Sequence, residues 1–239
     1  MSVFRFQQFS VLQERSAMRV CTDATLFGAM APVRGGEQVL DIGAGTGLLA
    51  LMTAQLGAGL VTAVELTEEA CDEARHNFSH SPWSDRLEAV HRDIQGFAAA
   101  TGNKYDLVIS NPPFFDSHSK SPATGRNIAR HTDLLPYADL IAATEKLLTR
   151  EGLFYLLIPL HGVDDFCAKA GAAGLYLVRR TDYRGYAHNM PKVSALTFSR
   201  EQGDFRSELL TIYREERVYS EESTKYLSPF LLRFAEETR

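Results

Sequence analysis

The sequence has few cysteines and no long apolar run. Its three cysteines, Cys21, Cys71 and Cys167, are far apart and odd in number. They fit neither a disulfide framework nor a Cys-x-x-Cys metal site, so we expect buried thiols, no metal centre and a reducing, cytoplasmic location. No stretch approaches the roughly 20 apolar residues that span a membrane, and the first residues lack the apolar core of a signal peptide. We therefore expect no membrane association.

Positive charge is also scarce. The formal net charge of −5 disfavours a broad nucleic-acid-binding surface, because neutralising phosphates requires clustered Lys and Arg. The segment 116–131 is a local exception, since its cations outnumber its single acid. These cations are candidate contacts to an RNA backbone, and a solvated loop is the alternative interpretation. They are Lys120, Arg126 and Arg130.

The chain has no internal repeat, low-complexity tract or Pro/Gly-rich linker. Strand-like and helix-like patterns alternate, which predicts an α/β domain with helices on both faces of its sheet. Residues 36–200 form the expected core, with an N-terminal arm (1–35) and a C-terminal strand and helix extension (201–239) as parts of the same domain. The expected strands cover residues 38–41, 60–65, 87–91, 105–110, 152–159, 175–181 and 193–200. The expected helices cover residues 23–30, 48–56, 67–78, 134–148 and about 163–173.

A glycine-rich segment, residues 41–47, joins the first core strand to its helix. It begins with Asp41, and the alternating Gly43, Gly45 and Gly47 allow a tight turn with backbone N–H groups close to a ligand. Leu48 occupies the position at which a dinucleotide-binding Gly-x-Gly-x-x-Gly needs its last glycine, and no P-loop Gly-Lys-Ser/Thr follows. We therefore expect a ligand without a pyrophosphate.

Two acids end the next two expected strands. Glu65 follows the glycine-rich turn by roughly the 20 residues at which an acid can bind ribose hydroxyls. Asp93 ends the third strand, where a carboxylate can accept a hydrogen bond from an adenine amino group. Each acid alone is equally consistent with a solvated strand end. Because ligands bind open α/β sheets at the carboxyl ends of their strands, both acids and the turn predict one site.

The tetrapeptide Asn111-Pro112-Pro113-Phe114 follows the apolar strand 107–109. The Asn111 amide oxygen can accept a hydrogen bond from a planar –NH₂ group, and the Pro112 carbonyl can accept its second hydrogen. Pro112 and Pro113 fix the backbone, while Phe114 offers a ring on which a heterocycle can stack. These parts suit a site that holds a planar amino nitrogen during a transfer. A Pro-Pro turn that closes a strand is the alternative interpretation.

In this set of motifs the chain resembles the class I S-adenosylmethionine-dependent methyltransferases. Residues 41–47 match their first motif, Glu65 their ribose-binding acid, Asp93 their adenine-contacting acid and residues 111–114 their catalytic motif. The resemblance implies a Rossmann-like, seven-stranded, mostly parallel sheet with one antiparallel strand. It also implies S-adenosylmethionine as cofactor. The tetrapeptide is typical of branches that methylate adenine N6, guanine N2 or a glutamine amide.

The N-terminal arm resembles a narrower family, the bacterial tRNA1(Val) adenine(37)-N6-methyltransferases. Residues 19–29 match their run Lys-Val-x-Thr-Asp-x-x-Leu-Leu-Gly-Ala, with Arg19 for the lysine and Phe27 for a leucine. The resemblance implies methylation of adenine 37 beside the tRNA anticodon, and an arm that packs on the cofactor site with Thr22 and Asp23 near the methionine end. We also expect a monomer. The expected cofactor-binding residues are Thr22, Asp41, Gly43, Gly45, Gly47, Glu65, Leu66, Asp93, Ile94 and Asn111. The expected catalytic residues are Asn111, Pro112, Pro113 and Phe114.

Other functions remain open on the residues alone. Protein-glutamine methyltransferases usually have tyrosine as the fourth motif residue and a separate helical domain, which this chain is too short to hold. In guanine-N2 rRNA methyltransferases the motif is often followed by histidine, where this chain has Phe115. No separate target-recognition domain of a DNA adenine methyltransferase is evident. A non-catalytic module that binds S-adenosylmethionine is the alternative of another class, although the intact motifs disfavour it.

Overall fold

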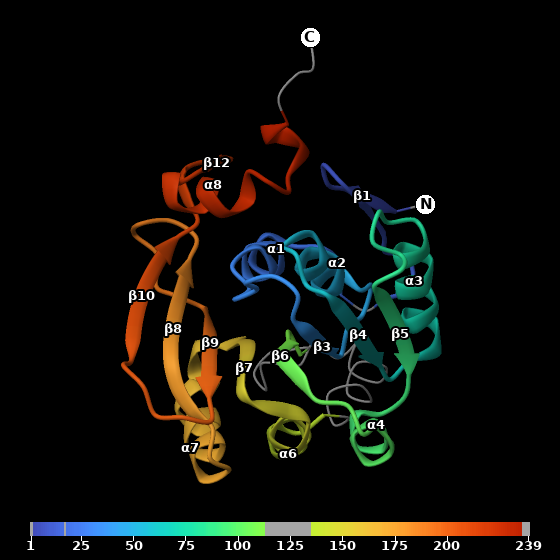
Figure 1. The fold of residues 1–239 in the computed structure, drawn as a ribbon. Helices are drawn as coiled ribbons and strands as arrows, with labels where there is room; N and C mark the ends of the chain where they lie inside the picture. The colour runs from blue at the N-terminus through green and yellow to red at the C-terminus, as the bar shows by residue number, and fades with distance from the viewer. Residues whose placement is uncertain (1, 17, 113–134, 236–239) are drawn as a thin grey trace, which may run out of the picture.

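The computed structural model describes residues 2–16, 18–112 and 135–235. A twisted eight-stranded sheet with strand order β10-β8-β9-β7-β6-β3-β4-β5 crosses the molecule (Figure 1). Its strands are β3 (Gln38–Ile42), β4 (Leu60–Glu65), β5 (Leu87–His91), β6 (Tyr105–Ser110), β7 (Leu148–Pro159), β8 (Tyr176–Arg184), β9 (Val193–Ser199) and β10 (Arg206–Thr211). All neighbouring strands are parallel except where β9 pairs with β7 and β8. The predicted mostly parallel sheet with one antiparallel strand is confirmed.

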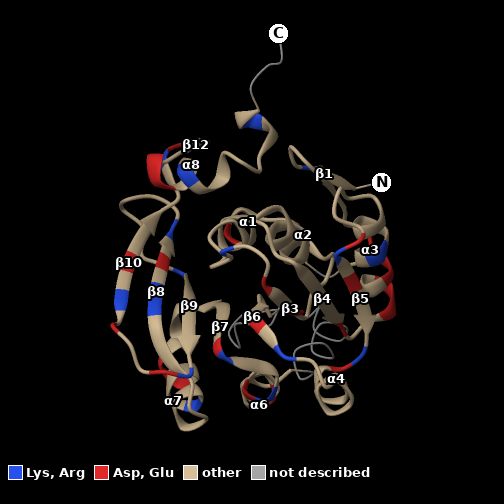
Figure 2. Ribbon diagram, viewed as in Figure 1, with Lys and Arg blue, Asp and Glu red and all other residues tan. Residues whose placement is uncertain are grey.

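The strand count is eight, where the sequence predicted seven. The extra strand, β10, belongs to the C-terminal extension and pairs in parallel with β8, Arg206 opposite Arg179 and Thr211 opposite Arg184. It joins the sheet because Leu210 is buried in the core. Arginines and acidic residues are interspersed along β8 and β10 (Figure 2), and Arg179 pairs with Glu208 across them at 2.8 Å.

Helices cover both faces of the sheet, as predicted (Figure 1). One layer contains α1 (Thr22–Ala29), α2 (Leu48–Gln55) and α3 (Glu68–Ser79). The other contains α4 (Ile94–Ala100), α6 (Tyr137–Leu147) and α7 (Val163–Ala172). Successive residues of β3 belong to opposite layers, since Val39 packs in the first core and Leu40 in the second. Such two-sided burial is what a strand inside a parallel α/β sheet requires. None of the described helices is long and apolar enough to cross a membrane.

The two ends of the chain pack on the first layer and on each other. The arm contributes a hairpin of β1 (Val3–Arg5) and β2 (Ser10–Leu12), and the C-terminal extension contributes β11 (Tyr213–Glu215), β12 (Val218–Tyr219) and α8 (Glu221–Leu227). The Gln7 side chain donates to the carbonyls of Ser228 and Leu231 at 2.7 and 2.9 Å. Short 3₁₀ turns span Leu160–Gly162 and Leu232–Phe234. The sequence did not indicate the two hairpins, because each is too short for a clear alternating pattern.

The three cysteines are free thiols in different environments. Cys71 is buried on α3 and Cys167 is partly buried on α7. Cys21, which precedes α1, is exposed, so the expectation of a buried thiol is wrong there. The reason is local: Cys21 stands at the N-cap in extended backbone, outside the apolar face that α1 packs on the core.

Candidate active site

The carboxyl ends of β3, β4, β5 and β6 surround a cavity of about 550 Å³. The sequence motifs converge there because parallel strands present their carboxyl ends at one edge of the sheet. The predicted site residues among its lining are Gly43, Gly45, Glu65, Leu66, Asp93, Ile94, Asn111 and Pro112. Val20, Ala24 and Thr46, from the predicted arm and glycine-rich segments, also line it, as do Arg15, Met18 and Arg92, which the sequence did not indicate.

The three glycines of the first turn have two different roles. Gly43 and Gly45 have φ angles of 72° and 54°, and a Cβ atom added to either would have no neighbour within 4 Å. Their backbone therefore stays open to a ligand. Gly47, with φ of 77°, has no such space, since an added Cβ atom would lie 2.4 Å from the Phe78 ring. Gly47 lets the start of α2 pack against α3, and it does not line the cavity.

Glu65 fixes the shape of this turn. One carboxylate oxygen accepts from the Gly45 N–H at 2.9 Å. The other accepts from the Thr67 N–H at 2.9 Å and from its hydroxyl at 3.0 Å. Oε1 already accepts these two bonds, whereas Oε2 accepts only one, so Oε2 keeps a free acceptor position for a ligand hydroxyl. Glu65 thus holds the glycine turn and faces the cavity at once.

The third strand ends at a helix cap. Asp93 is the N-cap of α4, and its Oδ1 accepts from the Gly96 N–H at 2.6 Å. The side chain is exposed and lines the cavity beside Ile94, which is buried. Leu66 is 38% exposed, an unusual position for leucine that places an apolar wall on the same cavity. The pair of apolar side chains next to a carboxylate suits a flat heterocycle with a polar edge.

Asp41 lies behind the turn and is fully buried. Its Oδ2 accepts from the Ala50 N–H at 3.2 Å, and Oδ1 has no partner among the described residues. Burial raises the pKa of Asp41 to about 7, the Ala50 hydrogen bond opposes this increase, and the nearby charge of Glu65 adds to it. Asp41 therefore supports the turn from below, and it is not among the residues that line the cavity.

Asn111 leaves β6 at the wall of the cavity, followed by the buried Pro112. Its Oδ1 is buried and has no hydrogen-bond partner within the described part of the chain. A buried amide oxygen without a partner is costly, so its position at a cavity wall points to a ligand donor. The preceding Ser110 is anchored by a 2.8 Å hydrogen bond to the Ile42 carbonyl, which ties β6 to the start of the glycine turn. The other predicted catalytic and RNA-contacting residues lie outside the described residues: Pro113, Phe114, Lys120, Arg126 and Arg130.

The arm closes one side of the cavity. Arg15, Met18, Arg19 and Val20 line it, followed by Ala24 of α1. Thr22 is not part of the lining; its hydroxyl lies 2.9 Å from that of Tyr213 in the C-terminal extension. The neighbouring Asp23 has a pKa that burial raises, and the positive charge of Lys192 opposes this change.

Two polar side chains of α3 hold the arm, and the sequence reading missed both. Glu73, 3% exposed, accepts from three backbone N–H groups of the arm. Asn77, 2% exposed, bonds both the N–H and the carbonyl of Leu12 and also the Thr46 carbonyl of the glycine turn. The sequence pattern could have indicated them, because both lie on the buried face of α3. The rest of that face is apolar, and a buried polar side chain needs a hydrogen-bond partner; its apolar residues are Ala70, Cys71, Ala74 and Phe78.

Comparison with known proteins identifies the family. The tRNA1(Val) (adenine(37)-N6)-methyltransferase of Klebsiella pneumoniae is 41% identical over 231 residues, covering 96% of this chain and 94% of the relative. That of Flavobacterium psychrophilum is 37% identical over 233 residues, covering 97% of this chain and all of the relative. The chain belongs to this methyltransferase family. The resemblance read from the arm and the motifs is thereby confirmed. Residues 17–158 of the chain also match the sequence-family model of the methyltransferase small domain.

Solved structures support the fold. A predicted O-methyltransferase from Agrobacterium tumefaciens superposes with a TM-score of 0.68, covering 85% of this methyltransferase and 94% of that chain, at 16% identity. A methyltransferase from Pyrococcus furiosus gives a TM-score of 0.61 over 81% of this chain and 90% of that chain, at 18% identity. At such identities the similarity shows a Rossmann-like methyltransferase fold and nothing about the substrate.

Proposed function

We propose that this enzyme transfers a methyl group from S-adenosylmethionine to N6 of adenine 37 in tRNA1(Val). Its relatives over nearly the whole chain carry this activity in their names, at 37 to 41% identity. The observation that carries the proposal is the buried, unpartnered amide oxygen of Asn111 at the wall of the cavity that Glu65 and Asp93 line. An amide oxygen in this position suits an amino group as substrate.

The residues of the cavity fit S-adenosylmethionine. Glu65 Oε2 retains acceptor capacity for a ribose hydroxyl, and Asp93 can accept from the amino group of an adenine held between Leu66 and Ile94. The open backbone at Gly43 and Gly45 admits the remainder of the molecule. The cavity of about 550 Å³ is of the size that small-molecule sites have. When bound, the cofactor supplies a methyl group that is already activated on a sulfonium.

Asn111 and Pro112 orient the acceptor nitrogen. The lone pair of an aromatic amino group is delocalised into its ring, so the nitrogen is a weak nucleophile. Hydrogen bonds from its two hydrogens to the Asn111 amide oxygen and the Pro112 carbonyl favour a tetrahedral nitrogen and localise the lone pair. The same two fixed acceptors stabilise the positive charge that develops on nitrogen as the bond forms. The anchored end of β6 supplies the fixed position that such catalysis requires.

The target adenine has to leave the base stack to reach this site, as unpaired anticodon-loop bases can. In this proposal Phe114 stacks on that adenine, and Lys120, Arg126 and Arg130 bind neighbouring phosphates. Localisation with tRNA in the cytoplasm and a monomeric state are further parts of the proposal.

The test uses Asn111→Ala, with the exposed Asn103→Ala as matched control. We expect Asn111→Ala to lower single-turnover methylation of unmodified tRNA1(Val) by two orders of magnitude or more, in line with the loss of one preorganised polar contact. Its dissociation constant for S-adenosylmethionine, measured by calorimetry, should change little. An equal loss of cofactor affinity would argue against the assigned role of Asn111.

The substrate is tested with methyl-labelled S-adenosylmethionine and, separately, unmodified tRNA, rRNA and release factor. Label recovered from tRNA as N6-methyladenosine would support the proposal. Label recovered as N2-methylguanosine in rRNA, or in a release-factor glutamine, would keep the role of Asn111 and replace the substrate. Cofactor binding without transfer to any of the three would favour a non-catalytic module.

A further inference from the structure

A chain of ring contacts crosses the surface beside the cofactor cavity. It runs from His188 through Tyr186, Tyr213 and Tyr219 to Phe234, and we refer to these residues as the aromatic strip. The centroids of successive rings are 5.7, 5.6, 5.0 and 6.1 Å apart. The first pair is nearly parallel, at 5°, and Tyr213 and Tyr219 are stacked at 18°. Three separate segments of sequence contribute, so the strip is a tertiary feature.

The strip lies at the edge of the sheet that carries the active site. The loop 185–192 follows the carboxyl end of β8 and leads into β9, whose first residue, Val193, pairs with Pro159 at the carboxyl end of β7. Since β6, β7 and β8 run in the same direction, this loop shares its edge with Asn111. Tyr213 joins the same edge through a 2.8 Å bond from its N–H to the Gly185 carbonyl.

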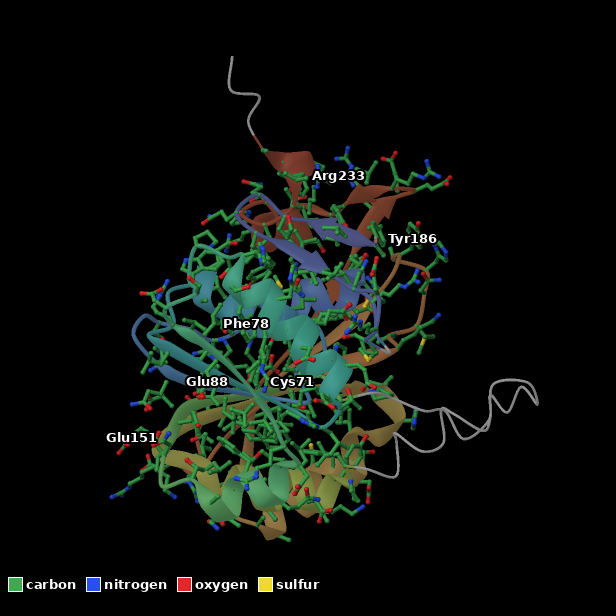
Figure 3. All side chains as sticks on the ribbon, turned by 90° about the vertical axis from the view of Figure 1, so that its right-hand side faces the viewer. Cys71, Phe78, Glu88, Glu151, Tyr186 and Arg233 are labelled. Atoms are coloured by element: carbon green, nitrogen blue, oxygen red, sulfur yellow. The ribbon has the colours of Figure 1, made fainter. Side chains whose placement is uncertain are left out.

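The strip also contacts the arm beside the cavity. The Tyr213 hydroxyl lies 2.9 Å from the hydroxyl of Thr22. Thr22 stands two residues from Val20 and two from Ala24, both of which line the cavity. Tyr186 and Arg233 lie toward the same end of the molecule, on the side seen at the right of Figure 3. The strip therefore meets the arm at its middle ring, Tyr213, and extends from there in two directions, to His188 and to Phe234.

The strip is accessible. His188 is exposed, and the other four rings are half-buried. Core aromatics of this protein differ: Phe27, Phe154 and Phe198 are completely buried. Tyr213 and Tyr219 have a structural task as partners in the β11–β12 hairpin. Stabilising that hairpin does not account for His188, which lies on a different loop and stacks on Tyr186 from the solvent side.

Positive charge accompanies the two ends of the strip, whereas the segment 213–222 between them also contains Glu215, Glu216, Glu221 and Glu222. The segment 184–192 contains Arg184, Lys192 and His188 and no acid. The Arg184 guanidinium bonds to a neutral partner, the Thr211 hydroxyl at 2.8 Å, so its charge is available to an anion. At the far end the Arg233 guanidinium lies 5.1 Å from the Tyr219 ring and 5.6 Å from the Phe234 ring. Rings interleaved with cations are the composition of surfaces that bind single-stranded nucleic acid.

We propose that the aromatic strip binds unpaired nucleotides next to the target adenine, with a base stacked on the exposed His188 and the phosphates beside Arg184 and Arg233. This inference rests on the proposed function, because it assumes an RNA substrate at the cavity. It accounts for recognition by an acidic protein: local stacking supplies affinity where a broad basic surface is missing. Unpaired bases are required, since paired bases do not expose a face for stacking.

The experiment measures RNA affinity with a fluorescently labelled anticodon hairpin of tRNA1(Val) and with a blunt RNA duplex of equal length. The variants are His188→Ala and Tyr186→Ala, each with its ring-keeping partner, His188→Phe and Tyr186→Phe. The control is Phe205→Ala, a 55% exposed aromatic that precedes the amino end of β10, at the opposite edge. Thermal unfolding and S-adenosylmethionine affinity report whether each variant is folded.

We expect each alanine variant to weaken hairpin binding roughly 5- to 100-fold, the range of one lost base stack. The phenylalanine variants, the Phe205→Ala control and the cofactor affinities should stay close to wild type. Unchanged hairpin binding by both alanine variants would overturn the inference. An equal loss of affinity for the duplex and the hairpin would also overturn it. So would a loss of hairpin affinity in His188→Phe as large as in His188→Ala, because neither result reflects stacking on a ring.

A methylation assay on the same samples separates this inference from the proposed function. If hairpin binding depends on the two rings but no methyl group is transferred to tRNA, nucleotide binding by the aromatic strip is supported and the proposed function is overturned. If both alanine variants transfer the methyl group to tRNA1(Val) with normal kinetics, the proposed function is supported and nucleotide binding by the aromatic strip is overturned.

Discussion

The carboxylate of Glu73 accepts a hydrogen bond from the backbone N–H of Arg15 at 3.0 Å, and Arg15 lines the cofactor cavity. The same carboxylate accepts from the N–H groups of Glu14 and Ser16, at 2.5 and 2.9 Å. One buried side chain thus determines the path of the arm over the cavity. Burial acts to raise the pKa of Glu73, but these hydrogen bonds outweigh it and hold the pKa below its usual value.

We expect Glu73→Gln to loosen the arm. The amide keeps one acceptor oxygen but loses the charge, and hydrogen bonds to a charged group contribute about 1.5–3 kcal/mol. The free energy of unfolding in urea should fall by about that amount, and the dissociation constant for S-adenosylmethionine should rise. Glu68→Gln, an exposed position in the first turn of the same helix, serves as control and should change both quantities much less. Equal effects of the two variants would contradict the role of Glu73.

Asn77→Asp tests the second tie between α3 and the arm. The Asn77 amide nitrogen donates to the Leu12 carbonyl at 3.0 Å and to the Thr46 carbonyl at 2.9 Å. A carboxylate cannot donate, so it would face two carbonyl oxygens in a buried site. We expect the free energy of unfolding at pH 7 to fall by at least about 2 kcal/mol. The deficit should shrink as the pH is lowered, because a protonated carboxyl donates one bond; a deficit independent of pH would refute this explanation.

The glycines of the turn should respond differently to alanine. At both Gly45 and Gly47 the positive φ angle imposes a similar cost, about 1–2 kcal/mol. Gly47→Ala should cost more stability, since its methyl group would overlap the Phe78 ring. Gly45→Ala should show only the backbone cost in thermal unfolding but a clear loss of S-adenosylmethionine affinity, because its methyl group would project into the space left for the ligand. Equal loss of affinity in the two variants would contradict this division.

The raised pKa of Asp41 predicts that the stability of the protein depends on pH. Its pKa is about 7 in the folded protein and about 4 when unfolded, so between these values the folded state binds the proton more tightly. The free energy of unfolding should therefore fall as the pH rises from about 4 to 7 and level off above. Relative to Asp41→Asn the change should be at most of order 4 kcal/mol. The exposed Asp204→Asn control should have a free energy of unfolding close to that of the wild type at every pH. If the difference between the wild type and Asp41→Asn does not change with pH, the raised pKa is disproved.

The sequence by itself determined the class of fold and the place of the site. Alternating strand and helix patterns predicted the parallel sheet and its two helix layers, and β6 and β4 lie at the predicted residues. Because parallel strands bring their carboxyl ends to one edge, the motifs at Gly43, Glu65, Asp93 and Asn111 could be predicted to meet. They all line one cavity. Local patterns and a topological rule sufficed for this part.

Only the tertiary structure decided which residues support the site. The eighth strand, the two arm ties of α3 and the aromatic strip depend on contacts between segments far apart in sequence, such as the bond from Gln7 to the carbonyl of Ser228, 221 residues away. The tertiary structure also showed that the two glycines have different roles, since Gly47 packs on Phe78 and Gly43 faces the cavity. A periodic pattern shows that a residue is buried, but the partner is selected by packing and by the need to satisfy each buried polar group.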